Sequence, residues 1–208
     1  IPMLPRILSE DACSLLPHVD RLSISCVFRI FLNGALDMET PPKFFLSVMR
    51  SAAKWDYDTV QKIIKNEEVK YEDLSDQMKP ESEETFNQMV ENVRTLYKLT
   101  SLVRTQRIES GSLIIENEEI AFNLSPDGYP MDFKIKKKLE SNNLIEELML
   151  IANKLTAEFL YEHIKENVLI RKHPLLNDSK FVEIQRYLSA NKIVVDFEDP
   201  QELNEMLM

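Results

Sequence analysis

A helix-forming stretch from about residue 142 to residue 165 constrains the fold most, because it is apolar over about half of its circumference. At about 100° per residue, ten residues between positions 144 and 160 cover that half, and all except Thr156 are apolar. Glu147, Lys154 and Glu158 gather in a narrow arc on the opposite side, which we expect to face water. A helix with so thin a polar stripe must pack against other elements on most of its sides.

Two polar residues of this helix fall outside the polar stripe. Glu146 and Asn153 lie together at about 180–200° from Leu144, with apolar residues on either side. A buried glutamate is rare unless it is paired or hydrogen-bonded. One interpretation is a structural bond, for instance from Glu146 to an arginine on a neighbouring element. The other is a polar channel for a ligand rich in hydrogen-bonding groups, such as RNA with its 2′-hydroxyls and base edges.

The rest of the chain mixes strand and helix patterns. Residues 22–30 alternate like a strand, Asn33-Gly34 marks a turn, and residues 44–49 should return as an antiparallel partner. Ser9 can cap a short helix. An acidic, polar stretch at about 67–82 is expected to be an exposed loop or insertion. Helices are also expected at 58–66, with Val60, Ile63 and Ile64 inward, at 83–107 and at 178–190, and strands at 120–124, 131–135, 168–171 and 193–196, the first two joined by a turn at 125–128.

Composition fits a folded domain and sets a condition on any nucleic-acid partner. Of 208 residues, 44% are hydrophobic and 29% charged, enough to bury a sizeable core. The net charge of −10 argues against RNA bound on the outer surface, but less so if RNA threads a channel with its own local lining. No apolar run reaches about 18 residues, so no membrane span is expected. Cys13 and Cys26 lack metal-site spacing and are expected to be reduced core residues.

Five sequence blocks, in order, resemble the catalytic (RNB) domain of the RNase II/RNase R superfamily. SNNLIEELMLIAN at 141–153 resembles the family's signature helix, usually written LIEEFMLLAN. Because the blocks follow the family's order over nearly the whole chain, the chain is identified as a member. Its details are closest to the eukaryotic cytoplasmic, exosome-independent branch that degrades uridylated RNA. The other blocks are MLPRILSEDACSL at 3–15 with DRL at 20–22, RSAAKWDY at 50–57, QRIESGSL at 106–113 and LIRKHP at 169–174.

The resemblance implies an α+β fold, the central part of an RNB-type domain, with antiparallel strands packed with long helices around a channel for single-stranded RNA. It implies processive 3′→5′ hydrolysis that releases nucleoside 5′-monophosphates, with Mg²⁺ held by aspartates. It also implies a cytoplasmic location and a uridylated RNA 3′ end as partner, with exosome association not favoured and no membrane.

The same motifs imply residues that contact RNA. Tyr57 and Glu146 resemble the residues that hold the last nucleotides near the cleavage site, and Asn153, Arg171 and His173 are further candidates. Structural roles remain open for several of them. Tyr57 could be a half-buried aromatic at a helix start, and Arg171 and His173 could hold a strand end.

Two motifs that carry the family's chemistry do not occur in this sequence. A D-x-D-D aspartate cluster belongs upstream of Ile1, and an R-R-Y-x-D motif belongs after Met208. We therefore expect residues 1–208 to be a partial RNB domain from a longer protein, with no catalytic or metal residue assigned. Such a piece should not cleave RNA alone, should bind it weakly and should tend to aggregate through unpaired strands.

Three hypotheses for the parent protein stay open. The first is an active exoribonuclease, and the second is a catalytically inactive RNB-fold protein that binds RNA as a regulator. The third is a helical interaction domain without an RNA role, which the acidic charge favours. The aspartate cluster would separate the first two.

Overall fold

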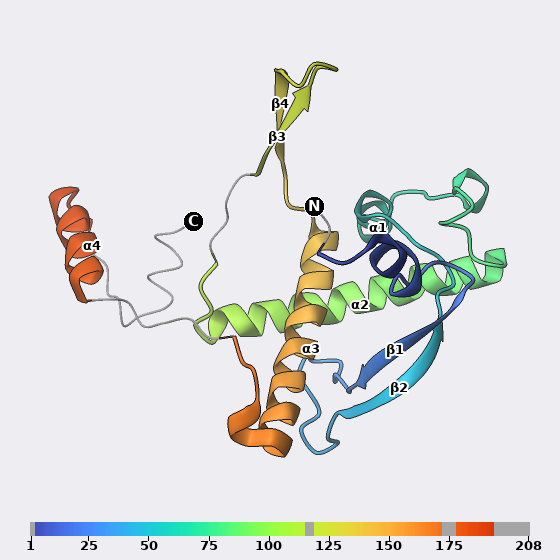
Figure 1. Ribbon diagram of the computed structural model, residues 1–208, viewed down its shortest axis with the longest axis horizontal. Helices are drawn as coiled ribbons and strands as arrows, with labels where there is room; N and C mark the ends of the chain where they lie inside the picture. Colours follow the sequence, from blue (N-terminus) through green and yellow to red (C-terminus); the bar gives the residue numbers. More distant parts are fainter. Residues whose placement is uncertain (1–2, 115–118, 172–177, 194–208) are drawn as a thin grey trace. The chain divides into compact units, whose positions relative to one another are not determined.

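The computed structural model describes residues 3–114, 119–171 and 178–193 (Figure 1). The chain divides into two compact units, residues 1–104 with 138–156 and residues 105–137 with 157–208. Helices α2 (Glu83–Glu109) and α3 (Glu140–Ile164) each begin in the first unit and end in the second. Long helices combined with antiparallel strands confirm the predicted α+β class.

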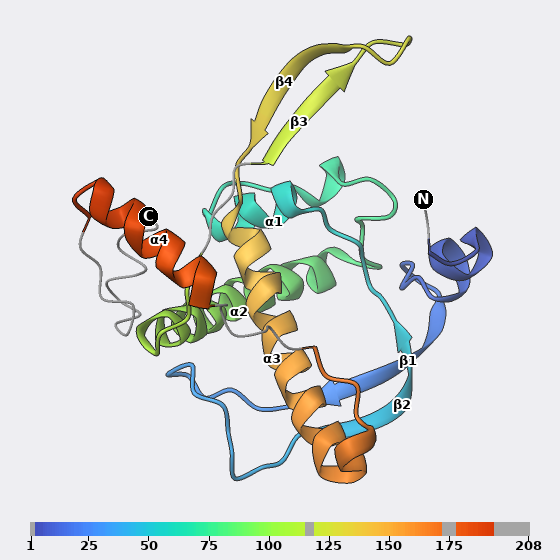
Figure 2. The same cartoon turned by 60° about the vertical axis from the view of Figure 1, so that its left-hand side comes forward.

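The first unit contains a long β-hairpin, visible in Figure 2. Strands β1 (Asp20–Val27) and β2 (Lys43–Arg50) pair antiparallel, with Leu22 opposite Val48 and Ile24 opposite Leu46. The predicted turn between them is also present. Gly34 has φ +85° and its N–H donates to the Phe31 carbonyl at 2.9 Å. This left-handed conformation explains why glycine stands there.

The N-terminal helix differs from the prediction. Residues Ile7–Ala12 form a short π-helix in which Ser9 is internal, and the N-cap position, at Arg6, has no side-chain cap. None of its residues is buried. Cys13, which follows it, is exposed, and Cys26 in β1 is half-buried, so the expectation of two core cysteines was wrong.

Helix α1 (Tyr57–Ile64) begins at a carboxylate cap and packs its apolar side inward. Asp56 accepts a hydrogen bond from the Thr59 N–H at 2.7 Å, as an N-cap residue does. Ile63 and Ile64 are buried and Val60 is half-buried, as predicted. The other buried apolar residues of the first unit are Phe86, Leu144, Ile151 and Leu155.

The acidic segment that follows α1 is a loop with a single 3-10 turn, Tyr71–Asp73. Several contacts, including two with aromatic residues, anchor it to the rest of the first unit, so it is not simply exposed. The Tyr71 ring lies 5.9 Å from the Phe86 ring, and the Trp55 indole N–H donates to the Met78 carbonyl at 2.8 Å. Pro80 is buried.

Helix α3 departs from the predicted wheel. Glu147, expected in water, is only 1% exposed, and its carboxylate lies 3.3 Å from the Arg104 guanidinium of α2. Ile145 and Met149, expected inside, are 48% and 52% exposed. The prediction was wrong because α2 supplies a cation on that side of α3, which makes a buried carboxylate tolerable.

The second unit contains another hairpin and a short helix. Strands β3 (Glu119–Leu124) and β4 (Pro130–Lys136) pair antiparallel through the predicted turn, where Gly128 has φ +84°. Helix α4 covers Asp178–Ala190, as predicted. Residues 168–171 are not a strand, which corrects the prediction; they follow a 3-10 turn at Lys165–Asn167 and pair with no described strand. The strand expected at 193–196 falls almost entirely outside the described residues.

No helix within the described ranges is long and apolar enough to cross a bilayer.

Candidate functional site

Tyr57 is the first residue of α1. A hydrogen bond holds its backbone in place, and its ring is accessible to solvent. The side chain is 48% exposed. Its carbonyl accepts a hydrogen bond from the Ser141 hydroxyl at 2.8 Å, which ties the start of α1 to the start of α3. Because Ser141 is 0% exposed, this bond is shielded from water. An exposed aromatic on a fixed backbone can stack on a base.

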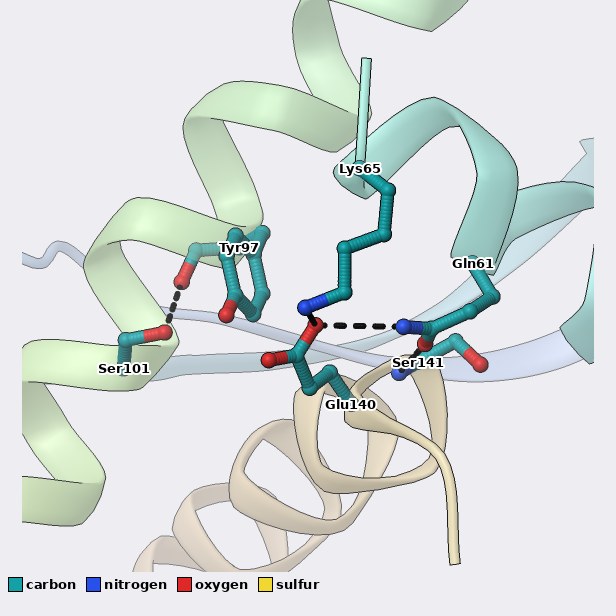
Figure 3. Close-up of polar contacts among 6 residues, drawn as sticks. All are labelled: Gln61, Lys65, Tyr97, Ser101, Glu140 and Ser141. Atoms are coloured by element: carbon teal, nitrogen blue, oxygen red, sulfur yellow. Dashed lines mark hydrogen bonds and ion pairs between the residues drawn. The ribbon is translucent and has the colours of Figure 1, made fainter. Parts of the chain in front are cut away.

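Next to this contact lies a polar network that we call the α1–α3 junction; Figure 3 shows its Gln61, Lys65, Glu140 and Ser141. The Gln61 side chain accepts from the Ser141 N–H at 3.0 Å and donates to the Glu140 carboxylate at 3.1 Å. The Lys65 ammonium lies 2.8 Å from the same carboxylate. The hydrogen bond from the Lys65 ammonium to the Glu140 carboxylate is the main reason why the pKa of Glu140 lies below its usual value. The same bond holds the pKa of Lys65 above its usual value. The junction consists of Tyr57, Gln61, Lys65, Glu140 and Ser141.

Glu146 lies two turns into α3 and is partly open to solvent. Its side chain is 32% exposed, and its carboxylate lies 2.5 Å from the ammonium of Lys138, which is 44% exposed. The mostly apolar surroundings predicted for Glu146 are therefore not found. The arginine partner that one interpretation gave to Glu146 belongs instead to its neighbour Glu147.

The other three predicted residues are less closely grouped. Asn153 is exposed on α3 in the same unit as Tyr57 and Glu146. Arg171 is exposed and belongs to the second unit. His173 lies outside the described residues. The RNA-contacting roles of all five residues stay predictions.

Sequence reasoning missed several residues that form the polar contacts of the first unit. Lys138, Gln61, Ser141 and Arg104 were not singled out. Lys138 had a signal, because four of the five residues at 134–138 are lysine in a chain with net charge −10. The others had none, because their partners are far away in the sequence.

The described residues offer no ligand set for a divalent cation. Within residues 3–114, 119–171 and 178–193, no three His, Cys, Asp or Glu side chains gather as a bound metal ion requires. These residues do not fit the Mg²⁺ that the resemblance implies.

The fold and the sequence together define the class of protein to which this chain belongs. The chain matches the RNB domain over residues 1–208 and belongs to that family. It is similar to RNase R of Mycoplasma genitalium, solved in complex with ribose-methylated single-stranded RNA, with a TM-score of 0.78 and 20% identity. That match covers 99% of this chain and 30% of the RNase R chain, and it supports the fold alone.

Among curated proteins, its relatives are named exonucleases. The chain is 32% identical to DIS3-like exonuclease 2 of Xenopus tropicalis over 100% of its own length and 24% of the frog protein. It is 37% identical to DIS3-like exonuclease 2 of Caenorhabditis elegans, over 84% of this chain and 20% of the nematode protein. It is also 29% identical to the "Inactive exonuclease DIS3L2" of Arabidopsis thaliana, over 100% of this chain and 19% of the plant protein. The chain thus spans about a quarter or less of the length of these relatives.

Proposed function

We propose that this chain is part of a 3′→5′ exoribonuclease that degrades single-stranded RNA processively and releases nucleoside 5′-monophosphates. In this proposal residues 1–208 are the central part of an RNB domain and contribute contacts to the RNA rather than the cleavage chemistry. Mg²⁺ ligands would come from aspartates elsewhere in the protein. The partner is an RNA 3′ end, uridylated by preference, and the location is cytoplasmic, with exosome association not favoured.

One observation supports the proposal most: the family match extends over the whole chain. Its relatives are named exonucleases, and a structural neighbour is titled as a complex with single-stranded RNA. The geometry is compatible, because the junction fixes the start of α1 beside that of α3 while leaving Tyr57 and Glu146 reachable. The acidic net charge is no obstacle if RNA meets a local lining rather than the whole surface.

A catalytically inactive RNA-binding protein of the same fold is the second candidate. The Arabidopsis relative named as inactive favours it, because its similarity to this chain, 29%, is close to that of the frog exonuclease, 32%. Sequence similarity over this region therefore does not separate active from inactive members.

The test is a degradation assay on oligouridine-ended RNA labelled at its 5′ end or at its 3′ end. A longer protein that carries this sequence is compared with the 208-residue chain, each with Mg²⁺ and with EDTA. We expect the longer protein to shorten 5′-labelled RNA stepwise and to release the 3′ label first, only with Mg²⁺. The 208-residue chain should leave both RNAs intact.

Two outcomes would contradict the proposal. Loss of the 5′ label first would give the wrong polarity. A longer protein that binds RNA but never shortens it would support the inactive regulator instead.

A further inference from the structure

Lys138 has a position that the fold alone does not explain. It lies two residues before the first residue of α3, next to the N-terminal end of this helix. The N-terminal end of a helix carries a partial positive charge. A cation is unfavourable there, whereas an anion would be stabilised. The Glu146 carboxylate, 2.5 Å away, offsets this repulsion. Because the two side chains are 44% and 32% exposed, their ion pair adds little to stability.

The stretch of sequence that ends at Lys138 differs in charge from the chain as a whole. The sequence carries 35 acidic and 25 basic residues, yet lysine occupies positions 134, 136, 137 and 138. These lysines come directly before α3, the helix whose motif implies contact with RNA. The sequence before α3 is therefore basic although the chain as a whole is acidic, and positive charge is what an RNA backbone attracts.

We propose that Lys138 is an RNA-contacting residue that binds a phosphate next to the nucleotide held at Glu146. This inference rests on the proposed function. A lysine ammonium has three N–H donors, so it can remain bonded to Glu146 and still donate to a phosphate oxygen. It also neutralises the Glu146 carboxylate, which would otherwise repel the RNA backbone. Lys138 therefore allows a carboxylate to stand beside an anionic ligand.

The experiment measures binding of fluorescein-labelled oligouridine to the 208-residue chain by anisotropy, across a series of KCl concentrations. Lys138→Gln and Lys138→Arg are compared with the wild type, with Glu146→Gln, and with the double variant of Lys138→Gln and Glu146→Gln. Lys98→Gln on α2 is the matched control, because Lys98 is an exposed lysine of the same unit outside the basic segment. Thermal melting of each variant checks folding.

We expect Lys138→Gln to weaken binding at low salt by about three- to tenfold and to reduce the salt slope by about 0.7, the value for one phosphate contact on a single strand. Lys138→Arg should retain the slope, and Lys98→Gln should change neither quantity. The loss should persist when Glu146 is also replaced by Gln. Melting temperatures should stay close to that of the wild type.

Three results would overturn the inference. The first is an unchanged slope in Lys138→Gln while the wild type binds RNA, which would leave the proposed function intact. The second is a loss that disappears in the Glu146→Gln background, because Lys138 would then act only through Glu146. The third is a wild-type chain that does not bind oligouridine at all, which would contradict the RNA contacts of the proposed function as well.

Discussion

At the scale of single residues, two adjacent glutamates of α3 lie in different electrostatic environments. Glu147 is 1% exposed and faces Arg104, whose side chain is 17% exposed. Glu146 is 32% exposed and faces the partly exposed Lys138. A buried ion pair and a surface ion pair respond differently to the loss of one partner, because only the buried one leaves a charge without water.

Replacing Glu147 by Leu should therefore destabilise the first unit strongly. Removal of one partner from a buried pair costs about 3–5 kcal/mol, because Arg104 would remain desolvated and uncompensated. Urea unfolding followed by circular dichroism measures the change. Combining Glu147→Leu with Arg104→Met should recover most of the loss.

Glu146→Gln is the matched control on the same helix, and it should change the free energy of unfolding by less than about 1 kcal/mol. A larger loss for Glu146→Gln than for Glu147→Leu would show that the burial of the two residues has been assigned the wrong way round.

At the scale of elements, the α1–α3 junction should make stability depend on pH in a defined direction. The pKa of Glu140 is lowered from 4.5 by its hydrogen bond with Lys65, so its contribution is complete above pH 4.5 and is lost as the pH falls through the folded value. The pKa of Lys65 is raised from 10.5, so its contribution is complete below that pH and is lost above it.

The difference in stability between the wild type and Glu140→Gln should therefore be constant from about pH 5 to pH 10 and shrink on both sides. The difference should be small throughout, since both side chains are substantially exposed. Chemical unfolding at a series of pH values measures it. A difference that grows as the pH falls below 4.5 would contradict the assigned pairing.

The packing of the β1–β2 connection against α2 can be tested with two glycines of nearly equal φ. An alanine Cβ at Gly34 (φ +85°) would lie 2.8 Å from the Leu102 Cβ and 3.2 Å from the Val103 nitrogen, whereas at Gly128 (φ +84°) nothing lies within 4 Å. Gly128→Ala should cost about 1–2 kcal/mol from backbone strain alone. Gly34→Ala should cost at least about 1 kcal/mol more, because the clash is with backbone and a Cβ. Equal melting temperatures for the two variants would mean that Gly34 does not approach α2.

The sequence predicted where the helices and strands lie along the chain better than it predicted which of their sides are buried. Alternation and turn chemistry located both hairpins, and helix α4 has the predicted bounds. Hydropathy failed for Glu147, because its partner Arg104 lies on another helix and no property of α3 alone reveals it. It also failed at residues 168–171, where a β-branched, apolar run without a described partner strand is not a strand. The family motif indicated Glu146 and the lysines at 134–138 mark that segment as basic, but the pairing of Lys138 with Glu146 became evident only from the structure.

At the scale of the whole molecule, one face of the β1–β2 hairpin leaves apolar side chains in water. Leu22, Ile24, Leu46 and Val48 share that face and are 84%, 78%, 84% and 65% exposed. Exposed apolar strands promote association between chains.

We expect the 208-residue chain to aggregate at high concentration. The double variant Leu22→Lys and Leu46→Lys should reduce this aggregation without lowering the melting temperature. Light scattering measures the first effect, and a wild-type chain that stays monomeric would contradict it.

In the proposed function, the first unit holds the 3′ end of an RNA around the starts of α1 and α3. The most direct test is photo-crosslinking of oligouridine with a 3′-terminal 4-thiouridine, followed by mass spectrometry of the crosslinked peptides. We predict crosslinks to peptides that contain Tyr57 or residues 138–153, reduced by unlabelled oligouridine. Crosslinks confined to other segments, such as the β1–β2 hairpin, would contradict the claim.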